Sequence, residues 1–149
     1  MSYRVDYDEP ISDVVTRLVE EHKEIDQKLE RISEISSKED GNLKVAISLL
    51  NAVSTEILRH AVEEEARLAR VIMESNETRE YSDESVEILQ EHRRIKEFFE
   101  DKLPYILDEN SEKQARKKII EFTDLVIKHH KEEEKELFPL SLRAASSKK

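Results

Sequence analysis

The stretch VIKHHKEEEKELFP, residues 126–139, sets two adjacent histidines beside three consecutive glutamates and ends in a proline. It belongs to a run of residues spaced by three or four: Ile119, Phe122, Val126, His129, Glu133, Leu137 and Leu140. This is the period of a helix that packs one face against other helices. The pattern predicts that His129 and Glu133 point inward. His130, about 100° further round the helix, is predicted to lie on the flank, with Glu132, Glu134 and Glu136 on a solvated face.

Three further segments show the same spacing, and each has a histidine on its apolar face. Their inward residues are Ile11, Val15, Leu18, His22, Ile25, Leu29 and Ile32; then Ala46, Leu50, Val53, Ile57, His60, Glu64, Leu68 and Val71; then Leu89, His92, Phe99, Leu103 and Ile106. Turn-forming stretches separate the segments: SSKEDGN around Gly41, ESNETREYS around Asn76 and DENS at 108–111. Ser82 is predicted to cap the third helix, and Pro104 to kink it or end it early.

Short connections join antiparallel neighbours, so the predicted fold is all-α: an antiparallel, up-down-up-down four-helix bundle. The bundle is expected over residues 11–142, with an N-terminal arm at 1–10 and a flexible tail at 143–149. A chain of 149 residues with one glycine and three prolines suits long helices around a single core.

Composition excludes several classes of function. A net charge of −10 argues against nucleic acid as a partner, because phosphate binding requires clustered lysine and arginine. The chain shows neither an apolar run long enough to span a membrane nor a secretory leader, so no membrane association and a cytoplasmic location are expected. With no cysteine, disulfides and thiolate metal sites are ruled out.

The four histidines of the apolar faces are predicted to lie at one height in the bundle. In antiparallel helices, two residues share a level when the turn lies midway between them in sequence. His22 and His60 centre on Gly41, and His60 and His92 centre on Asn76. His92 and His129 centre on the DENS turn. All three midpoints therefore fall in predicted turns, which the apolar pattern alone does not require.

Two glutamates join this layer, because Glu64 follows His60 by four residues and Glu133 follows His129 by four. A single core histidine is usually just hydrogen-bonded, but buried carboxylates together with four imidazoles require compensation that a divalent metal supplies. The mixture of ligands suits non-haem iron or manganese. The donors could hold one crowded ion or two ions bridged by both glutamates. The second arrangement leaves room for a bridging oxide or hydroxide and a small ligand, and we favour it.

The two halves of the chain also resemble each other. LVEEHKEIDQKLE at 18–30 matches ILQEHRRIKEFFE at 88–100, with an offset of 70 residues between the histidines. LRHAVEEEARL at 58–68 matches IKHHKEEEKELF at 127–138, with an offset of 69. A duplicated helical hairpin predicts a pseudo-twofold site, in which each copy contributes two histidines and one glutamate. By the inward spacing that selects Glu133 over its neighbours, Glu63 and Glu65 are less suitable ligands than Glu64.

The ordered set of His22, His60-x-x-x-Glu64, His92 and His129-x-x-x-Glu133, followed by Leu137-Phe138-Pro139, resembles the hemerythrin-like (HHE cation-binding) domain family over roughly residues 10–140. The resemblance implies a four-helix bundle with two iron ions in an oxo- or hydroxo-bridged centre, with manganese or zinc as alternatives. The two carboxylates would bridge the ions and the histidines would be terminal ligands. Ferritin-like di-iron bundles are disfavoured, because their Glu-x-x-His signature occurs at none of these histidines.

Two features depart from the oxygen carriers of that family. The third helix has Ile88 and Lys96 where a second histidine would stand, and the fourth helix has Glu133 four residues after its histidine and Glu134 five after, in place of an aspartate at five.

Three functions stay open from the sequence. The first is binding of dioxygen or another small diatomic for sensing, storage or delivery. The second is a di-iron redox enzyme that reduces peroxide or nitric oxide, with Tyr81 and Tyr105 as the aromatics that could lie nearby. The third is an iron sensor that folds on metal binding.

Overall fold

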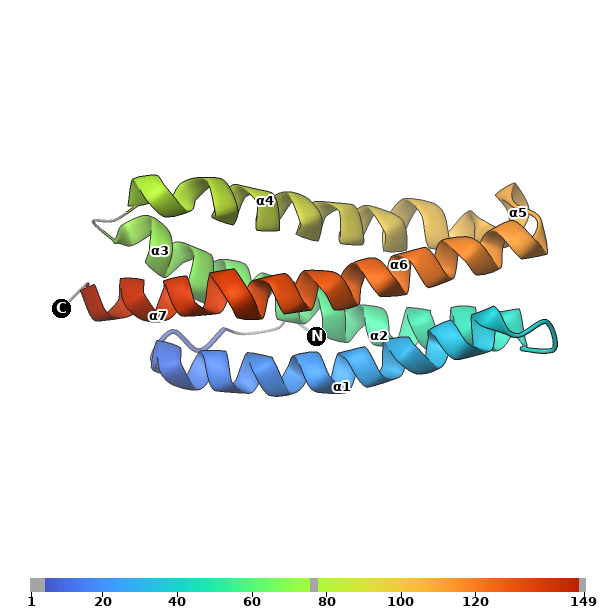
Figure 1. The fold of residues 1–149 in the computed structure, drawn as a ribbon, viewed down its shortest axis with the longest axis horizontal. Helices are drawn as coiled ribbons and strands as arrows, with labels where there is room; N and C mark the ends of the chain where they lie inside the picture. Colours follow the sequence, from blue (N-terminus) through green and yellow to red (C-terminus); the bar gives the residue numbers. More distant parts are fainter. Residues whose placement is uncertain (1–4, 76–77, 148–149) are drawn as a thin grey trace.

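The computed structural model describes the backbone of residues 5–75 and 78–147, and the side chains within these ranges except for 78–85 and 147. The described chain forms the predicted up-down-up-down bundle of four helical rods (Figure 1). The first rod is α1 (Ile11–Ser37), and the second comprises α2 (Leu43–Glu63), the π-helical segment η1 (Glu64–Ala69) and α3 (Arg70–Glu74). The third comprises α4 (Thr78–Glu97), η2 (Phe98–Lys102), η3 (Leu103–Tyr105) and α5 (Ile106–Glu109), and the fourth α6 (Glu112–Glu132), η4 (Glu133–Leu137) and α7 (Phe138–Ser147).

Two of the three predicted turns lie where the sequence places them. Asn42 caps α2 by accepting hydrogen bonds from the backbone of Lys44 and Val45. Ser111 begins α6 with a reciprocal capping box to Gln114. Gly41 leaves no room for a side chain, because a Cβ there would overlap the carbonyl oxygen of Ile35. The turn predicted at Asn76 lies outside the described residues.

The third rod departs from a single straight helix. Around Pro104 the α-helix gives way to the π-helical segment η2 and the 3₁₀ turn η3, which confirms the predicted interruption, because proline cannot donate a backbone hydrogen bond. The N-cap prediction at Ser82 is wrong: α4 begins at Thr78, so Ser82 lies within the helix.

Two apolar clusters fill the bundle, one on each side of a polar layer. The larger cluster includes Leu29, Leu50 and Phe122 and runs toward the end that carries the α1–α2 turn. The smaller includes Leu18, Leu68 and Leu137 and lies toward the opposite end. On the first, second and fourth rods, His22, His60 and His129 lie in sequence between residues of one cluster and residues of the other. Burial of these large apolar side chains is the dominant favourable term that holds the rods together.

Two π-helical segments begin at the predicted glutamate ligands. η1 starts at Glu64 and η4 at Glu133. In both segments, one inward residue lies four positions before the glutamate and the next lies four positions after it, as in His60, Glu64 and Leu68. In an α-helix, each step of four residues rotates the side chain about 40° beyond a full turn, and therefore away from the inward direction. The wider turn of a π-helix corrects this rotation. Such π-bulges are typical of functional sites.

The chain ends differ in part from the predicted arm and tail. Residues 5–10 form no helix and lie against the bundle, where the Arg67 guanidinium donates to the carbonyl oxygens of Asp6 and Glu9. At the other end, α7 continues to Ser147, and Ala144 within it is buried. The helix thus extends through five residues that the sequence pattern assigned to a flexible tail.

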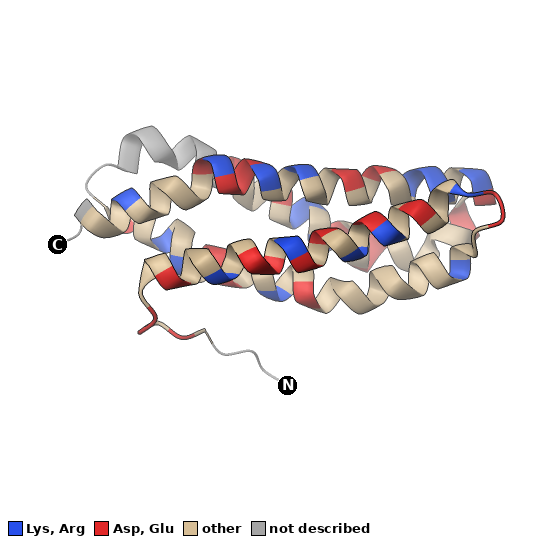
Figure 2. Cartoon of the chain, turned by 60° about the horizontal axis from the view of Figure 1, so that its bottom comes forward, with Lys and Arg blue, Asp and Glu red and all other residues tan. Residues whose placement is uncertain are grey.

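Acidic and basic residues alternate over the outside of the helices in Figure 2, and neither sign occupies a rod alone. None of the described helices combines the length and the apolar composition that crossing a lipid bilayer requires.

Candidate metal centre

The structure brings all six predicted ligands together in one buried layer. Each rod supplies one histidine, and the second and fourth rods each add a glutamate at the point where the α-helix becomes a π-helix. No more than 6% of any of these residues is exposed, and Glu133 is fully buried. The four rods therefore place these side chains at one level along the bundle, as predicted from the positions of the turns midway between the histidines.

The two carboxylates each reach toward both sides of the layer. Glu64 Oε2 lies 3.2 Å from His60 Nε2, while its Oε1 lies 3.3 Å from His92 Nε2. Glu133 Oε1 lies 3.2 Å from His22 Nε2, while its Oε2 lies 3.2 Å from the Nε2 atoms of both His92 and His129. One oxygen of each glutamate thus faces the first half of the bundle and the other oxygen faces the second half.

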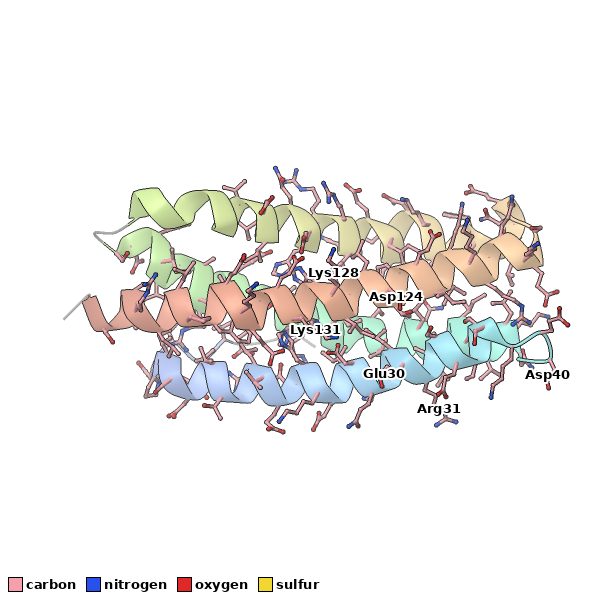
Figure 3. All side chains as sticks on the ribbon, in the orientation of Figure 1. Glu30, Arg31, Asp40, Asp124, Lys128 and Lys131 are labelled. Atoms are coloured by element: carbon pink, nitrogen blue, oxygen red, sulfur yellow. The ribbon has the colours of Figure 1, made fainter. Side chains whose placement is uncertain are left out.

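His130 is a fifth histidine of this layer, and its predicted place on the flank is wrong. Only 2% of it is exposed, its ring stacks 4.0 Å from the ring of His22, and it joins His22, His60 and Glu133 in one group of potential ligands. The other group comprises Glu64, His92, His129 and Glu133. Lys128 and Lys131 on either side of the histidine pair are exposed (Figure 3). Two adjacent positions can both be buried because the fourth rod packs against the first on one side and the third on the other.

A second ring of carboxylates holds the outer nitrogens of the imidazoles. His60 Nδ1 donates to Glu21 at 2.9 Å, His92 Nδ1 to Glu65 at 3.0 Å and His130 Nδ1 to Asp26 at 2.6 Å. His129 Nδ1 donates to Glu91, and His22 Nδ1 approaches Glu134 at 3.5 Å. A carboxylate on Nδ1 fixes the tautomer and leaves the Nε2 lone pair free for a metal.

Most inner atoms of the layer lack the hydrogen bonds that buried polar groups normally have, although His92 Nε2 is within hydrogen-bond geometry of Glu133 Oε2 at 3.2 Å. Among the described residues, the buried side-chain atoms without a partner include His22 Nε2, His60 Nε2 and His129 Nε2, together with Glu64 Oε2 and Glu133 Oε1. These atoms lie near one another without hydrogen-bond geometry. Neighbouring ligands of an ion at about 2.1 Å are themselves about 3 Å apart, so the separations of 3.2–3.6 Å fit donors that converge on metal ions.

Without metal, the layer is neutralised by protons. Burial alone would lower the pKa of each inward histidine, but the neighbouring carboxylates outweigh it and raise the pKa of His60 to about 10, of His92 to about 12 and of His129 to about 9. Burial likewise works to raise the pKa of Glu133, yet the surrounding histidines bring it to about 2. His130 differs, because burial outweighs its Asp26 partner and lowers its pKa.

The remaining sequence expectations have mixed outcomes. Glu63 is buried but pairs with Arg17 outside the layer, and Glu65 contacts only the outer nitrogen of His92, so neither replaces Glu64. Glu134 is half-buried beside His22, so it is not simply part of a solvated face. Tyr105 is 51% exposed, and the side chain of Tyr81 lies outside the described residues.

Loading the metal-free protein with a divalent cation at pH 7 should release at least three protons per chain, one each from His60, His92 and His129, with a further contribution from His22, whose pKa Glu133 and Glu64 also raise, because a metal binds only the neutral imidazole. The apparent affinity should therefore rise with pH up to about 12, most steeply below about 9, where all three histidines are still protonated, and fall as the solution is made more acidic. Calorimetric titration in buffers of different ionisation enthalpy measures the protons released. An enthalpy independent of the buffer would contradict this assignment.

Comparison with known proteins agrees with the geometry of the layer. The chain matches the model of the hemerythrin HHE cation-binding domain over residues 13–141, which contain all five buried histidines and both inner glutamates. No curated protein and no solved structure matches the chain. The match covers most of the chain, and the bundle with its central layer of histidines and glutamates is the one expected of that family. The protein therefore belongs to the hemerythrin HHE cation-binding domain family.

Proposed function

We propose that this protein is a non-haem di-iron protein that binds dioxygen or another small diatomic molecule between its four rods. The proposal rests on the placement of the two inner carboxylates: one oxygen of each faces one half of the layer, and the other oxygen faces the other half. His22, His60, His130 and one oxygen of each glutamate would hold one ion. His92, His129 and the other two oxygens would hold the second.

Two ions fit these donors better than one crowded ion. The potential ligands separate into two groups that share Glu133, and the atoms within each group lie within 4.8 Å of one another. Five imidazoles around a single ion would leave the two-sided placement of the carboxylate oxygens unexplained. Two divalent ions also compensate two buried carboxylates whose desolvation costs several kcal/mol each.

Iron is the ion that this mixture of imidazole and carboxylate ligands suits well, and manganese or zinc could use the same donors. When bound, a pair of iron ions supplies redox chemistry toward small oxygen-containing molecules. The protein's own residues bind the ions, orient them through the outer carboxylates, and exclude water with the apolar clusters on both sides.

Binding is favoured over turnover by the surroundings of the centre. The hydrogen bonds and ion pairs of the layer join the inner histidines and glutamates to one another and to the outer carboxylates, and the ring of Phe138 lies 5.3 Å from that of His22. The ionisable groups on the inner side are thus all committed to holding metal. Sensing, storage or delivery of a small molecule uses such a site directly.

Replacing Glu64 or Glu133 by alanine should lower the iron content from two ions per chain to about one or fewer, because either change removes a ligand shared by both ions. Elemental analysis of purified protein against its concentration provides the measurement. Glu136→Ala is the matched control, since Glu136 lies about one turn after Glu133 and is exposed. Unchanged iron content in both variants would refute the proposed centre.

Exposure of the reduced, iron-loaded protein to dioxygen should produce a new visible absorption band that disappears again when oxygen is removed. Stopped-flow spectroscopy with repeated cycles of oxygen and argon measures this reversibility. Immediate and irreversible oxidation would contradict a carrier or storage role, and would favour the redox enzyme. Loss of the fold on removing iron, together with no oxygen-dependent band, would favour an iron sensor.

A further inference from the structure

Arg17 connects the N-terminal arm to the candidate metal centre. Its guanidinium donates to three carboxylates from three segments of the chain: Glu9 of the arm at 2.6 Å, Glu21 of α1 at 3.1 Å and Glu63 of α2 at 2.7 Å. Glu21 in turn accepts from His60 Nδ1 at 2.9 Å. A continuous path of hydrogen bonds therefore runs from the arm to the imidazole of a proposed ligand.

Buried groups fix the guanidinium of Arg17 in this place. Only 3% of the Glu63 side chain is exposed, so its carboxylate requires a cation, and Arg17 meets both of its oxygens with two N–H groups. Arg67, which is 7% exposed, donates to two carbonyl oxygens of the arm and holds the arm against the bundle. Arg17 is thus held from two sides while it contacts Glu21.

The corresponding position in the second half of the chain carries the opposite charge. Residues of α1 correspond to those of α4 at an offset of 70, so Glu21 corresponds to Glu91 and Arg17 to Glu87. Glu87 is exposed and lies one turn before Glu91, where like charges repel. The two halves therefore share an outer carboxylate on the histidine, but only in the first half does an arginine at this position orient that carboxylate.

We propose that Arg17 is a positioning residue of the centre, which holds the Glu21 carboxylate on His60 Nδ1 and so keeps His60 Nε2 directed at one of the two ions. The inference rests on the proposed two-ion centre. Loss of an outer partner of a metal-bound histidine typically costs about tenfold or more in metal affinity, because the ring is no longer held in orientation. The arm contributes, because Glu9 holds the same guanidinium. Without Arg17, one ion should leave the protein more rapidly than before.

Zinc is the probe for this inference, because a d¹⁰ ion leaves the NMR signals of the full chain sharp. In Arg17→Met, the His60 Nδ1 proton should exchange with water faster than in the wild type. The His129 Nδ1 proton, which is held by Glu91, should not change. Transfer of zinc to a chelator should show one of the two ions leaving about tenfold faster. Arg31→Met, at an exposed position of the same helix (Figure 3), is the matched control and should behave as the wild type.

A second set of variants separates positioning from folding, since Arg17→Met also removes the cation that pairs with the buried Glu63. Glu63→Gln removes that buried charge and leaves Arg17 beside Glu21. Adding Arg17→Met to Glu63→Gln should then accelerate exchange of the His60 proton relative to Glu63→Gln alone. Glu9→Ala in the wild-type background should give a smaller acceleration of the same kind, and no change there would remove the arm from the proposal.

The outcomes separate this inference from the function beneath it. Equal exchange of the His60 proton with and without Arg17 in the Glu63→Gln background would overturn the inference. Equal acceleration at His60 and His129 would also overturn it, because a general loosening of the bundle would then be the cause. Fewer than two zinc ions in the wild-type protein, measured by elemental analysis, would contradict the two-ion centre, while exchange of the His60 proton would still test Arg17.

Discussion

The structure depends on one electrostatic constraint: two carboxylates, Glu64 and Glu133, stand at the centre of a bundle from which water is excluded. Charge at such depth is tolerated only when it is paired or bound to metal. In the metal-free chain the protonated imidazoles meet this requirement, as the raised pKa values of His60, His92 and His129 show. Bound cations would replace those protons. Protons and cations would therefore compete for the same imidazole nitrogens.

The rest of the fold positions this layer. Apolar clusters on both sides set the spacing of the rods, and the π-helical segments let the inward face continue past each glutamate. The outer carboxylates then fix the rotation of the rings, so that each Nε2 atom is directed to the interior. Arg17 extends the arrangement outward, because it contacts Glu9 of the N-terminal arm and Glu21, the partner of His60. The arm is thus connected by polar contacts to His60 of the central layer.

Much of this arrangement could be predicted from sequence, because helical periodicity and turn positions are local properties. The midpoints between histidines predicted a common level, and the structure has it. His130 could not be found in this way, because a single apolar face describes a helix with one neighbour, whereas α6 is buried between two. The sequence feature that could have indicated the burial of His130 is Asp26, which lies one turn after His22 and has no acidic counterpart in the second half of the chain. The outer glutamates were missed for a related reason: their partners lie on other rods, and long-range pairing leaves no local pattern.

The duplication explains both the order of the site and its asymmetry. A repeated hairpin places equivalent side chains around a pseudo-twofold axis, and a substitution such as His130 on one side makes the two halves of the layer differ. The central claim is that two ions lie between Glu64 and Glu133. An anomalous difference map from iron-loaded crystals tests it directly. Two peaks, each bordered by one oxygen of both glutamates, are predicted, and a single peak, or peaks away from this layer, would contradict the account.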